Sequence, residues 1–95
     1  PKQTDFSIKA KIYLYKDADV TSVLTTIHAK LNEYKISLAE KLGKNVIQTQ
    51  IISILNSVYG VFKVELETPS DIDIIESEWA NLVDFNIEVG GYADE

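Results

Sequence analysis

The side chains of this chain that could do chemistry are few, and the first of them is a lone histidine. His28 stands where apolar residues recur every three or four positions, which places it on a helix beside Leu24 and Ile27. An imidazole can act as a general base near neutral pH, but it needs a nucleophile or a carboxylate at a matching position. No serine, cysteine or carboxylate is spaced from His28 as such a catalytic pair would require. We therefore expect a boundary-facing helix residue and no catalytic residues.

Four carboxylates gather in "SDIDIIESE", residues 70–78, and could suggest a divalent cation: Asp71, Asp73, Glu76 and Glu78. The segment lacks the spacing of a calcium loop, with its central glycine and terminal bidentate glutamate. "GKNVIQT", residues 43–49, has one glycine and one lysine and is not a phosphate loop. The sequence therefore predicts a solvated acidic loop, with no metal, no cofactor and no enzymatic activity.

The aromatic residues point to contacts rather than to reactions. Tyr13 and Tyr15 fall on the solvent side of a predicted strand, and Trp79 falls in a segment of ambiguous pattern. Tyrosine and tryptophan are over-represented at protein interfaces. We take these three as interface residues. The alternatives are strand propensity with packing on lysine stems for the tyrosines, and a plug at the end of the core for Trp79.

Charge narrows the classes of partner. The net charge is −6, and all nine cationic residues are lysines. Nucleic-acid surfaces are usually basic and use arginine, so we expect no nucleic acid. An acidic chain also avoids anionic membranes, and no apolar run approaches the roughly 18–20 residues of a membrane span. We expect no membrane contact and no small-molecule substrate.

Length and the absence of methionine bear on domain organisation. We expect residues 1–95 to form a single domain, with flexible ends at 1–4 and 90–95. Methionine is absent even at position 1, so we expect a domain of a longer chain. Removal of an initiator methionine before Pro1 is the alternative.

The first half of the chain predicts a strand and a helix. "DFSIKAKIYLYK", residues 5–16, alternates, with Phe6, Ile8, Ala10, Ile12 and Leu14 on one side. Apolar residues then recur at helical spacing over 20–42. Asp19 suits its N-cap and Gly43 its left-handed C-cap.

The second half predicts a helix and two strands. A helix begins near Thr49 as N-cap and stops at Gly60, where a tight turn leads into a strand with Phe62, Val64 and Leu66 inward. Pro69 ends that strand.

The remaining segment predicts the third strand. Residues 71–82 fit either an extended segment or a helix face, and we expect an extended start followed by one helical turn near Glu76–Ala80. Residues 83–89 alternate again, with Val83, Phe85, Ile87 and Val89 inward.

Together these elements predict an α+β fold, a two-layer β-α-α-β-β sandwich with two antiparallel helices on one face of a three-stranded sheet. The outward residues are basic on the first strand and acidic on the other two. Opposite charges on neighbouring strands are favourable, so we expect the first strand in the centre. The second strand should run antiparallel to it.

The ordered set of these features resembles the C-terminal domain of the baseplate J-like family of contractile phage tails and related injection machines. The resemblance covers residues 20–90 and is carried by "LGKNVIQTQIISILNSVYGVFKVELETPSDIDI" followed by "EWANLVDFNIEV". It lies in a helix closed by Leu-Gly, a second helix, Gly-Val before a strand, then Pro, "DIDI" and a closing strand. The lack of arginine and the acidic crossover depart from the family pattern.

The resemblance implies that residues 1–95 are the C-terminal domain of a longer chain, and that this chain is a structural component of a phage or phage-like contractile tail baseplate. Its partners would be other baseplate or tail proteins, or copies of itself. Its location would be the virion tail baseplate, or the bacterial cytoplasm during assembly. The family offers no catalytic residues to carry over. The alternative is a small-molecule-sensing or regulatory α+β domain, for which a concave pocket with convergent polar groups would be the sign.

Overall fold

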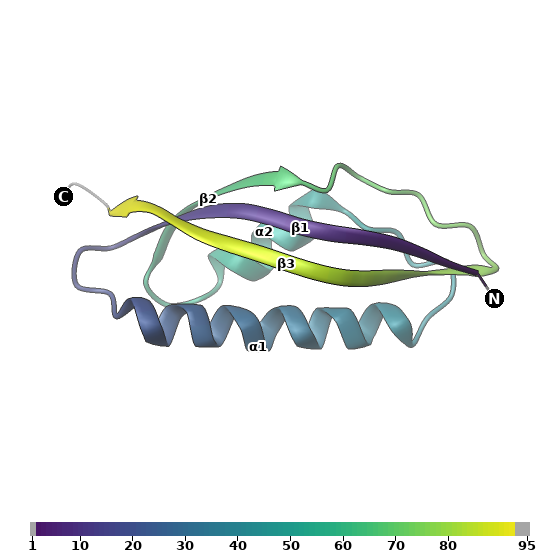
Figure 1. Cartoon of the computed structure of the whole chain (residues 1–95), viewed down its shortest axis with the longest axis horizontal. Coiled ribbons are helices and arrows are strands. Elements are labelled where there is room, and N and C mark those ends of the chain that lie inside the picture. Colours follow the sequence, from purple (N-terminus) through teal and green to yellow (C-terminus); the bar gives the residue numbers. More distant parts are fainter. Residues whose placement is uncertain (1, 93–95) are drawn as a thin grey trace.

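A computed structural model describes residues 2–92, which form a three-stranded sheet covered by two helices (Figure 1). The elements in chain order are β1 (Lys2–Leu14), α1 (Val20–Ala39), α2 (Gln48–Asn56), β2 (Val61–Thr68) and β3 (Glu78–Tyr92). Side chains from both helices join the inward face of β1 in one buried cluster. In Figure 1, α2 runs back against the direction of α1. The predicted α+β class and β-α-α-β-β order are confirmed.

The sheet has the order β2-β1-β3, with β1 antiparallel to β2 and parallel to β3. The prediction of a central first strand, made from charge, is therefore correct. Lys11 faces Glu65 on one side and Glu88 on the other. Each such cross-strand pair contributes a few tenths of a kcal/mol. The five residues predicted to point inward from β1 are all buried: Phe6, Ile8, Ala10, Ile12 and Leu14.

A bulge at the start of β2 corrects the prediction for Phe62. Tyr13 of β1 pairs with Lys63. The next residue, Leu14, pairs with Val61, which leaves Phe62 without a partner on β1. An extra residue in one strand shifts the alternation, so Val61 takes the inward place and is buried. Phe62 is 43% exposed instead of lying in the core.

A second bulge, in β3, corrects the prediction for Val83. Phe6 pairs with Leu82, but its neighbour Ser7 pairs with Asp84. Val83 is skipped in the register and is 57% exposed. Leu82 is buried in its stead, and the predicted inward positions of β3 beyond the bulge are half-buried: Phe85, Ile87 and Val89.

The helix ends differ from the predicted ones. α1 has Asp19 as its N-cap, as predicted, but it ends at Ala39, and Leu42 is exposed. Gly43 does have a positive φ of 72°, in the loop beyond the helix, where its N–H donates to the Glu78 carbonyl at 2.8 Å. This bond turns the chain toward the start of β3, which is why the last predicted turn of α1 is missing.

The second helix also starts and stops earlier than predicted. Its N-cap is Ile47 rather than Thr49, and it ends at Asn56, before Gly60. The prediction failed because the first helical N–H, of Gln48, is satisfied by Asp71 of a distant loop at 2.8 Å. Gly60 makes the turn into β2 with φ 100°. That positive φ favours glycine, and a Cβ there would also lie in a tight contact of 3.0 Å with the Val23 side chain.

The loop between the helices is tied to the crossover between β2 and β3, and we call residues 43–48 the strap. Val46 and Ile72 exchange two backbone bonds, of 3.0 and 2.8 Å. This confirms the predicted extended start of the crossover. Glu78–Ala80 belong to β3, so the predicted helical turn near Glu76–Ala80 is wrong. Four further bonds of the strap run from Gly43 N to Glu78 O, Ile74 N to Asn45 Oδ1, Gln48 N to Asp71 Oδ1 and Gln48 Nε2 to Pro69 O.

The ends of the chain bear on the predicted flexible segments. Residues 2–4 lie in β1 and residues 90–92 lie in β3. Pro1 and residues 93–95 lie outside the described residues. Flexibility of the ends stays a prediction.

One tyrosine of α1, Tyr34, is buried on the side of the helix that faces the core. Tyr34 is 6% exposed, and its hydroxyl has no hydrogen-bond partner among the residues that the structure describes. Because burial removes the phenolate from water, it raises the pKa of Tyr34 above the ordinary value of 10.0.

We predict that Tyr34→Phe removes part of the loss of stability at alkaline pH. Above pH 10.0 the unfolded phenol ionises before the folded one, so the unfolded state binds fewer protons and the unfolding free energy falls. Denaturation between pH 8 and pH 11 should show a shallower fall for the variant. At pH 7 it should be within about 1 kcal/mol of the parent, since no protein hydrogen bond is lost. A larger loss would reveal a partner for the hydroxyl.

The strap yields a second prediction. Asn45→Ala deprives the partly buried Ile74 N–H of its acceptor, so we expect a loss of about 1–2 kcal/mol in chemical denaturation. Asn86→Ala, an exposed position on β3, is the matched control and should stay within about 0.5 kcal/mol. Equal effects of the two variants would contradict a stabilising role for the strap.

Candidate interaction surface

The face of the sheet that points away from the helices carries charged residues in neutralising pairs. We call it the outer face. The Nζ atom of Lys9 lies 3.9 Å from Oε1 of Glu67, and the Nζ atom of Lys63 lies 3.3 Å from Oε2 of Glu65. These side chains are about half exposed, so each pair contributes at most about 1 kcal/mol to folding. The pairs leave the outer face with little net charge near β2.

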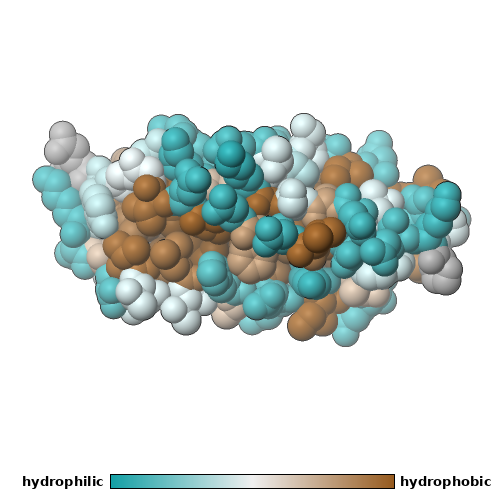
Figure 2. Space-filling view, viewed as in Figure 1, coloured by the Kyte–Doolittle hydropathy of each residue, from teal (hydrophilic) through white to brown (hydrophobic). Residues whose placement is uncertain are grey.

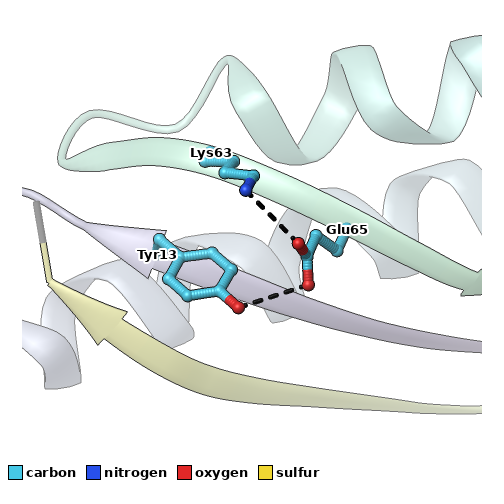
Figure 3. Close-up of polar contacts among 3 residues, drawn as sticks. All are labelled: Tyr13, Lys63 and Glu65. Atoms are coloured by element: carbon cyan, nitrogen blue, oxygen red, sulfur yellow. Dashed lines mark hydrogen bonds and ion pairs between the residues drawn. The ribbon is translucent and has the colours of Figure 1, made fainter.

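Tyr13 lies in a defined position on this face (Figure 3). Its hydroxyl donates to Glu65 Oε1 at 3.2 Å, and the ammonium of Lys63 lies 5.2 Å from its ring centroid. Figure 3 shows that Glu65 joins the two, with one carboxylate oxygen toward each. A ring already held by hydrogen-bond and cation–π contacts loses little entropy when a partner covers it.

Two glycines of β3 make room for Tyr13. A Cβ on Gly90 would lie 2.9 Å from the ring carbon Cζ of Tyr13 and 2.6 Å from the stem of Lys11. A Cβ on Gly91 would lie 3.5 Å from the same ring, which is ordinary contact. Tyr13 therefore spans from the glycines of β3 to Glu65 of β2. "VGG", which reads in the sequence as a tail, supports this ring.

Tyr15 lies at the same end of the sheet and packs on Phe62. The ring centroids are 5.5 Å apart at an interplanar angle of 69°, an edge-to-face contact. Tyr15 is 45% exposed and Phe62 is 43% exposed. The sequence missed Phe62 as a surface residue because the bulge that turns it outward leaves no mark in the alternation. We call Tyr13, Tyr15 and Phe62 the aromatic end of the outer face.

Trp79 is on the same face but at the other end. It pairs with Gln3, and its neighbours Ala80 and Leu82 are buried on the core side, as alternation requires. Ten residues of β1 separate Gln3 from Tyr13, which is about 33 Å at 3.3 Å per residue. Trp79 is half-buried and does not belong to the buried core. The structure thus brings Tyr13 and Tyr15 together and leaves Trp79 apart.

Tyr59 is an exposed aromatic that sequence reasoning did not select. It lies in the turn between α2 and β2 and is 95% exposed. It borders a surface cavity of about 410 Å³ beside the start of α1. The polar residues around this cavity are Asp17, Asp19, Ser22 and Thr26, and Ser22 donates to Asp19 at 2.8 Å.

The histidine and two of the acidic residues first considered for chemistry make packing or hydrogen-bond contacts within the fold. His28 is exposed on α1, as expected of a boundary residue. Its ring packs edge-to-face on that of Phe85, with the two ring centroids 5.1 Å apart. Asp71 caps α2, and Glu78 accepts from the Thr4 hydroxyl at 3.3 Å. Within residues 2–92, no three His, Cys, Asp or Glu side chains are grouped so as to hold a metal ion. None of the helices described is long and apolar enough to cross a membrane.

Fold and surface together define a two-layer α+β domain whose conspicuous features are a charged outer face and exposed aromatic rings. The chain belongs to the Baseplate J-like protein C-terminal domain family, whose model matches residues 6–88. A search of curated proteins gives no significant match. Membership confirms the resemblance drawn from the sequence and suggests a structural role in a phage baseplate.

We predict that Gly90→Ala disturbs the Tyr13 site whereas Gly91→Ala does not. The added methyl group on residue 90 must displace Tyr13 and Lys11. We therefore expect the free energy of unfolding, measured by chemical denaturation, to fall by about 1 kcal/mol. The tyrosine signal in near-ultraviolet circular dichroism should change as well. At residue 91 the methyl group meets only ordinary contact and should be neutral or stabilise by about 0.5 kcal/mol. Identical behaviour of the two would mean that Tyr13 does not rest on Gly90.

Proposed function

We propose that this domain is a structural component of a contractile tail baseplate and acts through protein–protein contacts with other baseplate or tail proteins. Family membership supports the baseplate role, and the ordered Tyr13 site on the outer face is the observation that carries the contact role. Tyr13, Tyr15 and Trp79 are the proposed anchors. No enzymatic activity is part of the proposal.

The physical case rests on what the outer face offers a partner. Aromatic side chains give much contact area for few rotatable bonds, and residues of this type dominate binding energy at interfaces. The ring of Tyr13 is held by Glu65 and Lys63, and that of Tyr15 by Phe62. Lysines already paired with glutamates lose less on desolvation than isolated ones. Anchors at both ends suit a partner that covers the length of the sheet.

We further propose that the domain ends a longer baseplate protein and resides in the virion baseplate, after assembly in the bacterial cytoplasm. The partners are other tail proteins or further copies of this protein. Neither nucleic acid nor membrane is a partner in this proposal, in keeping with the net charge of −6.

The test is assembly of the complete baseplate with Tyr13→Ser, Tyr15→Ser and Trp79→Ser in this domain, counted as particles by electron microscopy. We expect fewer or incomplete particles and a melting curve of the domain close to that of the parent. Tyr59→Ser is the matched control, because that tyrosine is more exposed but lies outside the outer face. A large fall in melting temperature would make the three residues stabilising parts of the fold. Normal assembly with an unchanged melting curve would remove the outer face from the contact.

A small-molecule-sensing domain is the second candidate, and the cavity of about 410 Å³ is the observation that favours it. Its size falls in the range of ligand sites, and hydroxyl and carboxylate side chains lie among the apolar residues that line it. Thermal shift against amino acids, nucleotides and metals tests this function. A reproducible stabilisation that Ser22→Ala abolishes would favour sensing over assembly.

A further inference from the structure

β3 has one edge that the described fold leaves open. It is the edge strand of the sheet and pairs only with β1 over its 15 residues. In the part of the chain that the structure describes, backbone bonds from outside the sheet reach β3 only at Glu78. Between the skipped residues Val83 and Gly90 the register is regular from Asp84 to Val89. We call residues 84–89 the open segment.

Natural proteins usually protect such an edge with lysine, proline or a covering element. The open segment, "DFNIEV", has no lysine and no proline. It does carry two carboxylates, of which Asp84 accepts from the Phe85 N–H at 2.8 Å, and the skipped residues Val83 and Gly90 lie on either side of it. Residues 84–89 between them keep a regular register over the length of an ordinary strand, so another strand can pair there.

An apolar stripe runs beside the open segment. On the helix side of the sheet, Phe85, Ile87 and Val89 alternate with outward polar residues and are only half-buried. Val20 and Leu24 of α1 are half-buried too, and α1 contacts β3 through His28 on Phe85. Figure 2 shows the result, a continuous hydrophobic area where the C-terminal half of β3 passes the N-terminal half of α1.

Charge decides which strand would fit this edge. Glu78–Tyr92 contains three carboxylates, of Glu78, Asp84 and Glu88, and no cation. Two copies of β3 side by side would therefore place like charges together, which is destabilising. The strand that β3 already pairs with has the opposite character, with Lys11 facing Glu88. A second neighbour should carry lysine or arginine in the same way.

We propose that the open segment is a docking edge for an extended strand of another protein. That strand alternates basic residues, which lie on the outer side of the sheet beside the carboxylates of Asp84 and Glu88, with apolar residues that cover Phe85, Ile87 and Val89. Main-chain bonds supply affinity in this mode of recognition, and alternate side chains supply specificity. The inference rests on the proposed function, because it names the kind of partner that a baseplate neighbour would present.

The probe is a capped synthetic peptide with the sequence of residues 6–14, "FSIKAKIYL", which has the basic and apolar alternation of β1. Added to the 95-residue chain, it should shift backbone amide resonances of residues 84–89 and 20–28 in nuclear magnetic resonance. A peptide with both lysines replaced by glutamate should bind at least tenfold more weakly. Raising the salt from 50 to 500 mM should weaken only the basic peptide.

Glu88→Lys and Glu67→Lys form a matched pair of variants of the chain. Both glutamates are exposed on edge strands and lie opposite a β1 lysine or pair with one. Glu88 belongs to the open segment, whereas Glu67 lies on β2, across β1. We expect Glu88→Lys to weaken the basic peptide at least fivefold and Glu67→Lys less than twofold, with both variants folded by circular dichroism.

Any of three peptide results would overturn the proposal: no binding of the basic peptide, equal binding of the acidic one, or shifts confined to β2 or α2. A dimer of the free chain with β3 amides protected from exchange would also overturn it, because a second copy would then cover the edge. These results are independent of the particle count for the Tyr13→Ser, Tyr15→Ser and Trp79→Ser variants. Impaired assembly without peptide binding would therefore reject strand docking alone, and peptide binding with normal assembly would reject the outer face alone.

Discussion

The burial of one face of β1 is the constraint on which the rest of this structure depends. β1 is the central strand, and its inward residues are all at most 7% exposed. Both helices and both other strands contribute to the cluster around it. Because a strand alternates, the same order that buries Ile8 and Ile12 commits Lys9, Lys11 and Tyr13 to the outer face. The core and the candidate interaction surface are thus two sides of a single strand.

Because β1 and β3 are parallel, the chain needs a long crossover between β2 and β3, and hydrogen bonds from the strap hold that crossover in place. A parallel neighbour cannot be reached by a hairpin, so residues 69–77 must run back along the domain. Irregular backbone of this length needs hydrogen-bond partners, and the loop between the helices supplies them through Val46, Asn45 and Gln48. Asp71, which looks like part of an acidic cluster in the sequence, acts here as the cap of α2.

Bulges connect the fold to the surfaces that a partner could use. The bulge at Phe62 turns that ring outward beside Tyr15, and the skipped residues Val83 and Gly90 bound the open segment of β3. Gly90 also admits the Tyr13 ring, so one irregularity serves both the outer face and the edge. A building block of an assembly needs surfaces that differ in chemistry. This domain has an aromatic and charge-paired face, and an acidic edge beside an apolar stripe.

The sequence by itself determined the elements, their order, the central place of β1 and the family, because periodicity leaves a regular pattern in near neighbours and the charges of the outward positions can be read from that pattern directly. Family membership could be predicted for the same reason, because the order of glycines, prolines and alternating segments can be read without knowing any tertiary contact. Only the tertiary structure decided the outward turn of Phe62 and Val83, the distant cap of α2, the start of β3 at Glu78 and the separation of Trp79 from Tyr13. Each of these depends on register or on a hydrogen bond between segments 20 or more residues apart in the chain, and each bulge turns only its skipped residue away from the side that the later alternation predicts.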